Sequence, residues 1–144
     1  MAHPRILVVD DQVELTGSMA QFFELNGYSV DVANDPRTAI ELMVRNLYKI
    51  VFCDVQMPGM SGLELLREFK RRHPMAVVMM ITGYHDVDVV VSCLEAGAYD
   101  FFPKPIEPLE TLLQAVQEAE EKLVRWARAL SGKAYVDGVG GRDG

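Results

Sequence analysis

Short apolar runs recur along the chain, and several of them are apolar throughout rather than alternating with polar residues. Runs of this kind are typical of parallel strands that are buried on both faces of a sheet. The pattern predicts five strands, over residues 6–9, 28–33, 50–53, 77–81 and 99–102.

The segments between these runs have helical periodicity, with start and stop signals at their ends. Asp35 followed by Pro36 is typical of a helix N-cap with proline in the first turn. Ser61 and Glu64 have the spacing of a capping box, and Gly97 lies where a helix-ending glycine belongs. Strands and helices are therefore expected to alternate along the whole chain.

Strict alternation of this kind predicts an α/β fold, a doubly wound five-stranded parallel sheet of (βα)5 type with helices on both faces. Such a sheet has its ligand crevice at the carboxyl ends of the strands, beside the point where the winding direction reverses. After the last strand, one apolar stripe at helical spacing runs from Glu107 to Leu130 and predicts an extended C-terminal helix.

Length and composition favour one soluble globular domain. The chain has 144 residues, of which 49% are hydrophobic and 24% charged, enough apolar side chains for a core. The formal net charge is −7, which has the wrong sign for binding nucleic-acid phosphates, so we expect no direct nucleic-acid partner.

Neither the cysteines nor the apolar runs indicate a secreted or membrane protein. Cys53 and Cys93 both lie inside apolar runs and are too few for a disulfide framework, so we expect reduced core thiols. The longest apolar run, residues 75–81, is too short to span a bilayer, and no signal-peptide core is found near the start. We therefore expect a cytoplasmic protein without a membrane partner.

Chemically matched residues follow four of the five predicted strands. They are Asp10 and Asp11 after the first, Asp54 after the third, Thr82 after the fourth and Lys104 after the fifth. In the flavodoxin-like strand order 2-1-3-4-5 the first and third strands are neighbours, which brings the three carboxylates together. Like charges this close need a counter-charge.

Magnesium would supply that charge, because Mg²⁺ prefers oxygen ligands, takes one or two carboxylates and keeps several waters. The ammonium group of Lys104 would stand on the other side of Asp54, and an anion between the two cations would be electrostatically complementary. A phosphoryl group attached to Asp54 is the obvious candidate. Taken singly, each residue has a simpler interpretation as a turn former, a strand residue or a surface charge, so the inference depends on the joint pattern.

The chain resembles the receiver domain of two-component response regulators over residues 5 to about 122. The matching stretches are ILVVDD (6–11), DVQMPGMSG (54–62), ITG (81–83) and GAYDFFPKP (97–105). The resemblance implies that the protein is a phosphorylation-dependent switch. It would catalyse only its own phosphotransfer and autodephosphorylation, and so is not an enzyme in the usual sense.

In this family Asp54 would be the phosphoacceptor, taking a phosphoryl group from a phosphohistidine on a sensor histidine kinase or a phosphotransfer protein. Asp11 would ligate Mg²⁺ directly and Asp10 largely through water. Asp54 and the backbone carbonyl of Gln56 would complete the protein ligands.

The resemblance also assigns the switch. Lys104 would pair with a phosphoryl oxygen, and its peptide bond to Pro105 would be cis. The hydroxyl of Thr82 would move to bind the phosphoryl group while Phe101, where the family commonly has Tyr, rotates inward. As an alternative, Phe101 is a core aromatic of the last strand.

Two further residues and one surface complete the expectations from the family. Gln56 and Tyr84 would flank the attacking water, and Tyr84 would lengthen the phosphorylated state by excluding it. The surface that changes would comprise the helix over 86–96, the strand over 99–102 and the last helix. A homodimer would form through this surface or through the extended last helix.

The resemblance divides the chain into a receiver domain (1–122), a helix extension (123–130) and a flexible Gly-rich tail (131–144). Leu123, Trp126 and Leu130 would have little of their own domain to pack on. The extension is expected to be a linker or a dimerising helix, or else a frayed end whose Trp126 folds back on the body.

Three other readings share parts of the pattern. A phosphohydrolase of the haloacid-dehalogenase class also uses a strand-end Asp nucleophile, but Gln56 stands where its general acid is required. In a flavodoxin-type electron carrier, Asp10 and Asp11 would repel the bound phosphate. A pseudo-receiver that serves as a protein-interaction module usually lacks part of the acidic set, which is complete here.

Overall fold

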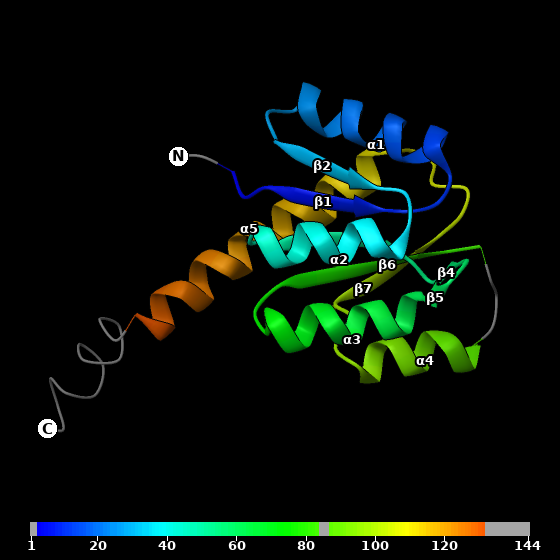
Figure 1. Ribbon diagram of the computed structural model, residues 1–144. Coiled ribbons are helices and arrows are strands. Elements are labelled where there is room, and N and C mark those ends of the chain that lie inside the picture. Colours follow the sequence, from blue (N-terminus) through cyan, green and yellow to red (C-terminus); the bar gives the residue numbers. More distant parts are fainter. Residues whose placement is uncertain (1–2, 84–86, 132–144) are drawn as a thin grey trace, which may run out of the picture.

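A five-stranded parallel sheet runs through the middle of the protein (Figure 1). The computed structural model describes residues 3–83 and 87–131. The strands lie in the order β2-β1-β3-β6-β7, which confirms the predicted order 2-1-3-4-5. Their bounds are Ile6–Val9 (β1), Val30–Ala33 (β2), Ile50–Asp54 (β3), Val77–Thr82 (β6) and Asp100–Pro103 (β7).

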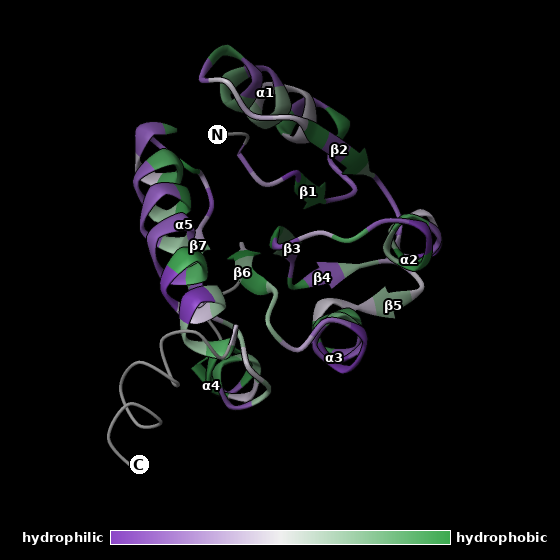
Figure 2. Ribbon diagram, turned by 90° about the vertical axis from the view of Figure 1, so that its left-hand side faces the viewer, coloured by the Kyte–Doolittle hydropathy of each residue, from purple (hydrophilic) through white to green (hydrophobic). Residues whose placement is uncertain are grey.

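Helices cover both faces of this sheet (Figure 2). One face carries α2, α3 and α4, and the other carries α1 and α5. Their bounds are Val13–Leu25 (α1), Pro36–Arg45 (α2), Gly62–Arg72 (α3), Val87–Glu95 (α4) and Glu110–Leu130 (α5).

The sheet separates two apolar cores, and the side chains of each strand alternate between them. In β1, Leu7 and Val9 join the core under α2, α3 and α4, whereas Ile6 and Val8 join the core under α1 and α5. The strands β1, β3 and β6 are buried over their whole length. This is why their sequences are apolar without alternation.

The predicted helix signals operate as expected. The Asp35 side chain accepts a hydrogen bond from the Thr38 amide at 2.8 Å, and Pro36 opens α2. Ser61 and Glu64 form the predicted capping box at the start of α3. Gly97 has a φ of 107°, in the left-handed region that suits glycine, two residues after the end of α4.

The five predicted strands form the sheet, but the start of one strand was wrong and a hairpin outside this sheet was missed. The strand predicted from Tyr28 begins at Val30, because the Tyr28 amide donates to the Phe23 carbonyl in the turn that closes α1. A short antiparallel hairpin, β4 (Gln56–Met57) with β5 (Met60–Ser61), was not predicted. Its strands have two residues each, too few for an alternating pattern to be visible in the sequence.

The C-terminal helix begins later than the apolar stripe, at Glu110 rather than Glu107, after a cis Glu107–Pro108 bond. The expectation that the extension lacks packing partners is wrong for Leu123 and Trp126. Both are half-buried and pack against the α1 and α5 core, whereas Leu130 is 69% exposed. Trp126 therefore contacts the body from within a continuous helix rather than from a frayed end.

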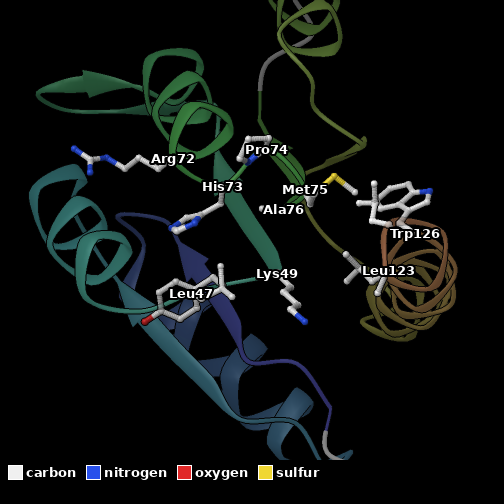
Figure 3. A pocket seen from close by; sticks show the side chains of 12 residues that line it. Leu47, Lys49, Arg72, His73, Pro74, Met75, Ala76, Leu123 and Trp126 are labelled. Carbon is white, nitrogen blue, oxygen red and sulfur yellow. The ribbon is translucent and has the colours of Figure 1, made fainter. Parts of the chain in front are cut away.

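An apolar pocket of about 380 Å³ lies between the α5 extension and the loops that precede β3 and β6 (Figure 3). In Figure 3, Trp126 and Leu123 lie on the α5 side, and Met75 and Leu47 come from the two loops. These loops meet the amino ends of the strands, so the extension seats on the edge of the sheet opposite the strand carboxyl ends. Apart from Ser131, the Gly-rich tail lies outside the described residues.

Cys53 and Cys93 are buried free thiols, as predicted. Burial raises the pKa of the Cys53 thiol, which keeps it protonated and unreactive. Within the described part of the chain, no helix is both long enough and apolar enough to cross a bilayer.

Gly62 allows α3 to begin directly against the end of β3. A Cβ atom at this position would lie 2.1 Å from the Asp54 carbonyl oxygen and 2.6 Å from the Val55 Cα atom. Both neighbours are backbone, and the Gly62 amide is bonded to the Val55 carbonyl at 2.7 Å. The neighbours can move apart only by shifting the backbone that carries Asp54.

We therefore expect Gly62→Ala to lower the free energy of unfolding by about 3 kcal/mol through overpacking, measured by urea denaturation. Gly17→Ala is the matched control, because nothing lies within 4 Å of a Cβ placed at this exposed position of α1. It should stabilise the protein by up to about 1 kcal/mol through helix propensity. Equal effects of the two changes on stability would contradict the close packing of Gly62 against the end of β3.

Candidate functional site

The carboxyl ends of β1, β3, β6 and β7 meet at one edge of the sheet. Asp10 and Asp11 follow β1, and Asp54 is the last residue of β3. One carboxylate oxygen from each of the three lies within 4.8 Å of the others. Thr82 ends β6, and its carbonyl accepts a hydrogen bond from the Lys104 amide at 2.8 Å. The structure thus brings together the five residues selected at the strand ends.

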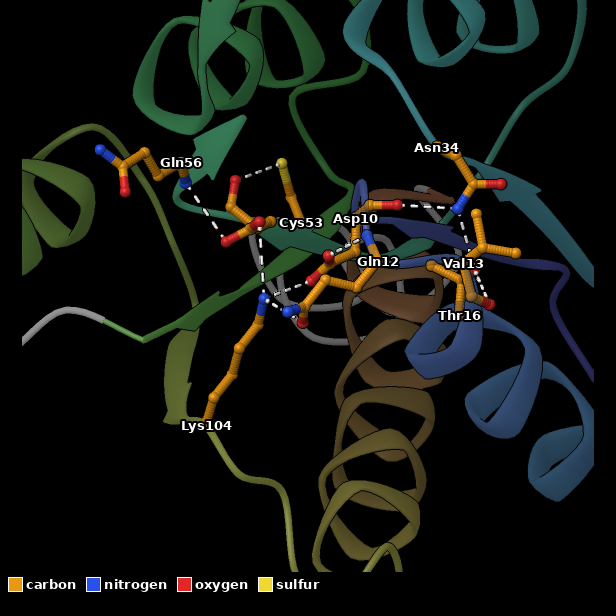
Figure 4. Close-up of polar contacts among 9 residues, drawn as sticks. Asp10, Gln12, Val13, Thr16, Asn34, Cys53, Gln56 and Lys104 are labelled. Atoms are coloured by element: carbon orange, nitrogen blue, oxygen red, sulfur yellow. Dashed lines mark hydrogen bonds and ion pairs between the residues drawn. The ribbon is translucent and has the colours of Figure 1, made fainter. Parts of the chain in front are cut away.

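Asp10 is fully buried and is held from two sides (Figure 4). Its Oδ1 accepts a hydrogen bond from the Gln12 amide at 2.8 Å, and its Oδ2 lies 2.8 Å from the Lys104 ammonium. The Asn34 side-chain amide donates to the Asp10 carbonyl at 2.8 Å and to Thr16 Oγ1 at 2.9 Å. These bonds fix the end of β1 against β2 and α1.

The ammonium group of Lys104 reaches the site from the segment after β7. Its Nζ lies 2.8 Å from Asp10 Oδ2, 3.0 Å from Gln12 Oε1 and 3.6 Å from Asp54 Oδ2. The Lys104–Pro105 peptide bond is cis, as predicted. Lys104 is therefore nearer to Asp10 than to Asp54.

Asp54 carries an unusual protonation equilibrium. Its residue is only 4% exposed, and burial together with the negative charges of Asp10 and Asp11 raises its carboxyl pKa to about 6. The Gln56 amide, 3.2 Å from Asp54 Oδ1, and the Lys104 charge oppose that rise. One lysine does not neutralise three carboxylates, so the site keeps an excess of negative charge.

The three carboxylates fit a divalent cation. All the donors are oxygens, which a hard cation prefers. Asp10 Oδ2 is buried, and among the described residues its partner is the Lys104 ammonium, 2.8 Å away, as an ion pair. Asp11 is exposed and leaves one side of the site open. The acidic triad is thus able to bind a divalent ion.

The structure describes all but one of the remaining predicted site residues. Thr82 is buried, and the Gln56 side chain is exposed. Phe101 is 39% exposed and therefore is not a core aromatic of β7. Tyr84 lies outside the described residues, as does Asp86, at which the helix over 86–96 was predicted to begin.

Gln12 and Asn34 were missed by the sequence reasoning. Each follows a strand closely, Gln12 two positions after the Asp that ends the first apolar run and Asn34 directly after β2. That position was the available signal, but neutral amides at strand ends are common turn formers.

Comparison with known proteins gives one consistent family. A family model described as "Response regulator receiver domain" matches residues 6–117. A cyclic di-GMP phosphodiesterase of Thermotoga maritima is 36% identical over 114 residues, covering 79% of this chain and 30% of that protein. The chain spans about a quarter to a half of the length of the curated relatives it matches.

Two solved structures are informative. The solution structure of the beryllofluoride-activated NtrC4 receiver domain dimer has a TM-score of 0.77 at 34% identity, covering 82% of this chain and 97% of that one. A response regulator protein of Burkholderia pseudomallei has a TM-score of 0.74 at 28% identity, covering 88% and 74%. The latter was determined with a phosphorylated aspartic acid, a calcium ion and citrate.

The raised pKa of Asp54 predicts a specific pH dependence of stability. Between its ordinary value of 3.8 and about 6, the native carboxyl holds a proton that the unfolded chain has released. The contribution of Asp54 to the free energy of unfolding therefore falls as pH rises through this window and remains low above it.

We expect metal-free Asp54→Asn to be more stable than wild type at pH 7 by up to about 3 kcal/mol, and to lose this advantage toward pH 4. Urea denaturation between pH 4 and pH 7 in the presence of a chelator measures the difference. Glu118→Gln, which changes an exposed carboxylate on α5, is the control. A stability difference independent of pH would contradict the assigned shift.

Proposed function

Because the chain belongs to the family of response regulator receiver domains, we propose that it is a phosphorylation-dependent switch in which Asp54 accepts the phosphoryl group. Receiver domains take phosphate from histidine kinases, and they are signalling modules without enzymatic activity apart from their own phosphorylation chemistry. The proposed donor is therefore a sensor histidine kinase or a phosphotransfer protein. The observation that carries the proposal is the buried Asp54 carboxylate, with two further carboxylates within 4.8 Å and an ammonium at 3.6 Å.

The reaction is a displacement at phosphorus. An Asp54 carboxylate oxygen forms the new bond to phosphorus, and the bond between phosphorus and the donor's histidine nitrogen breaks, leaving neutral imidazole once a proton is taken up. The nucleophile is the ionised form of Asp54, which the raised pKa disfavours. A nearby positive charge stabilises this ionised form. Lys104 supplies one such charge and pairs with a phosphoryl oxygen in the product.

We propose Mg²⁺ as the divalent ion, held by Asp10, Asp11, Asp54 and the Gln56 backbone carbonyl. When bound, it neutralises the carboxylates and the transferred group. Asp11, the exposed member, is the direct ligand, and Asp10 acts largely through water. The similar response regulator protein of Burkholderia pseudomallei was determined with both a phosphorylated aspartic acid and a calcium ion, which agrees with this proposal.

The response passes from the phosphoryl group to β7 and α4. Thr82 ends β6 beside Asp54, and its hydroxyl is proposed to turn toward the phosphoryl group. Phe101, exposed on the neighbouring β7, then rotates inward to fill the space. Gln56 and Tyr84 are proposed to flank the attacking water and to set the lifetime.

The exposed apolar residues on α4 and β7 favour this surface for a homodimer. Val87, Val91, Leu94 and Phe101 are large exposed hydrophobic residues of these two neighbouring elements. The similar NtrC4 receiver domain is a dimer when activated with beryllofluoride. The α5 extension, residues 123–130, offers Val124 and Leu130 as an alternative or additional contact.

We further propose that residues 1–122 form the receiver body, that 123–130 extend it as a linker or dimerisation helix, and that 131–144 are a flexible tail. A cytoplasmic location agrees with the two buried free thiols. The phosphohydrolase alternative stays unsupported because the side-chain amide of Gln56 is too weakly acidic to serve as a general acid.

Incubation with acetyl phosphate and Mg²⁺ should add one acid-stable, base-labile phosphoryl group to the wild type, measured by intact mass. Asp54→Asn should remain unmodified, and a chelator should abolish the reaction. Asp100→Asn, which changes an exposed carboxylate on β7, is the control and should react like the wild type. A phosphoryl group that persists in Asp54→Asn would refute the assignment.

Light scattering after size exclusion should show a doubling of mass when beryllofluoride and Mg²⁺ are added. Leu94→Glu should keep the protein monomeric, because a charge would be buried at the α4 surface. Leu130→Glu should still dimerise. The reverse result would move the interface to the α5 extension.

A further inference from the structure

The side chain of Gln12 does not cap the helix that it precedes. Gln12 is the N-cap residue of α1, with φ −83° and ψ 101°, and its side chain makes no capping hydrogen bond. Ser, Thr, Asp and Asn are preferred there because their short side chains reach the first free amides of the helix. The Gln12 side chain instead accepts a hydrogen bond from Lys104 Nζ, 92 residues along the chain, at 3.0 Å.

This bond lies on one side of the phosphorylation site. The backbone N–H of Gln12 also donates to Asp10 Oδ1 at 2.8 Å. The backbone of Gln12 therefore binds Asp10 while its side chain binds Lys104, and these two residues form an ion pair with each other. In Figure 4, dashed lines join Lys104 Nζ to both Gln12 and Asp10. The distance to Asp54 Oδ2, 3.6 Å, is beyond an ordinary hydrogen bond.

The neutral amide suits this position. Asp10, Asp11 and Asp54 already repel one another, because one carboxylate oxygen of each lies within 4.8 Å of the others. An amide oxygen binds the ammonium without adding a fourth negative charge. When a divalent cation binds Asp10, the side chain of Gln12 can still accept the hydrogen bond from Lys104.

We propose that Gln12 is a positioning residue that holds the Lys104 ammonium on the Asp10 side of the site in the unphosphorylated protein. This inference rests on the proposed function for its consequence. Lys104 must leave Gln12 to pair with a phosphoryl oxygen on Asp54, so the bond stabilises the unphosphorylated state alone. An interaction made in one state shifts the balance against the other.

Removal of the side-chain amide of Gln12 should therefore strengthen binding of a phosphoryl analogue. We expect Gln12→Ser and Gln12→Ala to bind beryllofluoride about tenfold more tightly than wild type at saturating Mg²⁺, the size of a hydrogen bond to a charged group. Isothermal titration calorimetry measures this. Gln12→Glu keeps an acceptor of the same reach and should not gain affinity, and Gln114→Ala, an exposed change on α5, is the control.

Two further readouts separate positioning from stability. Gln12→Ser should raise the urea midpoint by capping α1, whereas Gln12→Ala should not, yet both should gain affinity. In the metal-free, unphosphorylated protein, the Lys104 ¹⁵Nζ resonance should show hydrogen exchange accelerated several-fold in both variants but not in Gln12→Glu.

Unchanged or weaker beryllofluoride binding in Gln12→Ser would overturn the proposal, as would an unchanged Lys104 exchange rate. If wild type binds no beryllofluoride, the proposed function fails. The exchange measurement then still decides the role of Gln12, because it needs neither metal nor phosphoryl analogue.

Discussion

Repulsion among three carboxylates at one edge of the sheet, two of them buried, is the constraint on which the rest of the site depends. Asp10 is fully buried and Asp54 nearly so, and Asp11 completes a cluster within 4.8 Å. Burial and mutual repulsion favour protonation of Asp54, whereas a nucleophile must be ionised. Every positive partner therefore acts on the same balance. The ionised carboxylates repel one another when no cation is bound, so binding of a cation relieves this repulsion.

The fold meets this constraint by closing the site with its last strand. Lys104 comes from the segment after β7, and the parallel order places β7 beside β6, with β3 and β6 between β7 and β1. The ammonium reaches across to Asp10 because the ends of β6 and β7 are tied by the bond from the Lys104 amide to the Thr82 carbonyl. α3 is fixed just as closely to the acceptor strand, since Gly62 permits no side chain between them. The Asp54 carboxylate is thus flanked by closely packed backbone and by the long side chain of Lys104.

The sequence predicted what depends on periodicity and on chain order. Uninterrupted apolar runs identified the strands, and the rule that parallel strands end at one edge brought Asp10, Asp54 and Lys104 together. The features that were not predicted depend on side-chain conformations and on contacts between residues far apart in the sequence. Gln12 has an ordinary turn-forming amide in sequence, and only the rotamers of Gln12 and Lys104 decide that the two meet. Trp126 looked unpartnered because the loops that cover it, around Leu47 and Met75, come from far earlier in the chain.

Trp126 also has an experimental meaning. It is the single tryptophan of the chain, and it sits where the α5 extension meets loops at the amino ends of the strands. The carboxylates lie at the opposite ends, roughly 20 Å away for a strand of this length. Its emission is therefore insensitive to local chemistry at Asp54 and sensitive to the seating of the extension. The protein carries a built-in optical probe for signals that have crossed the whole sheet.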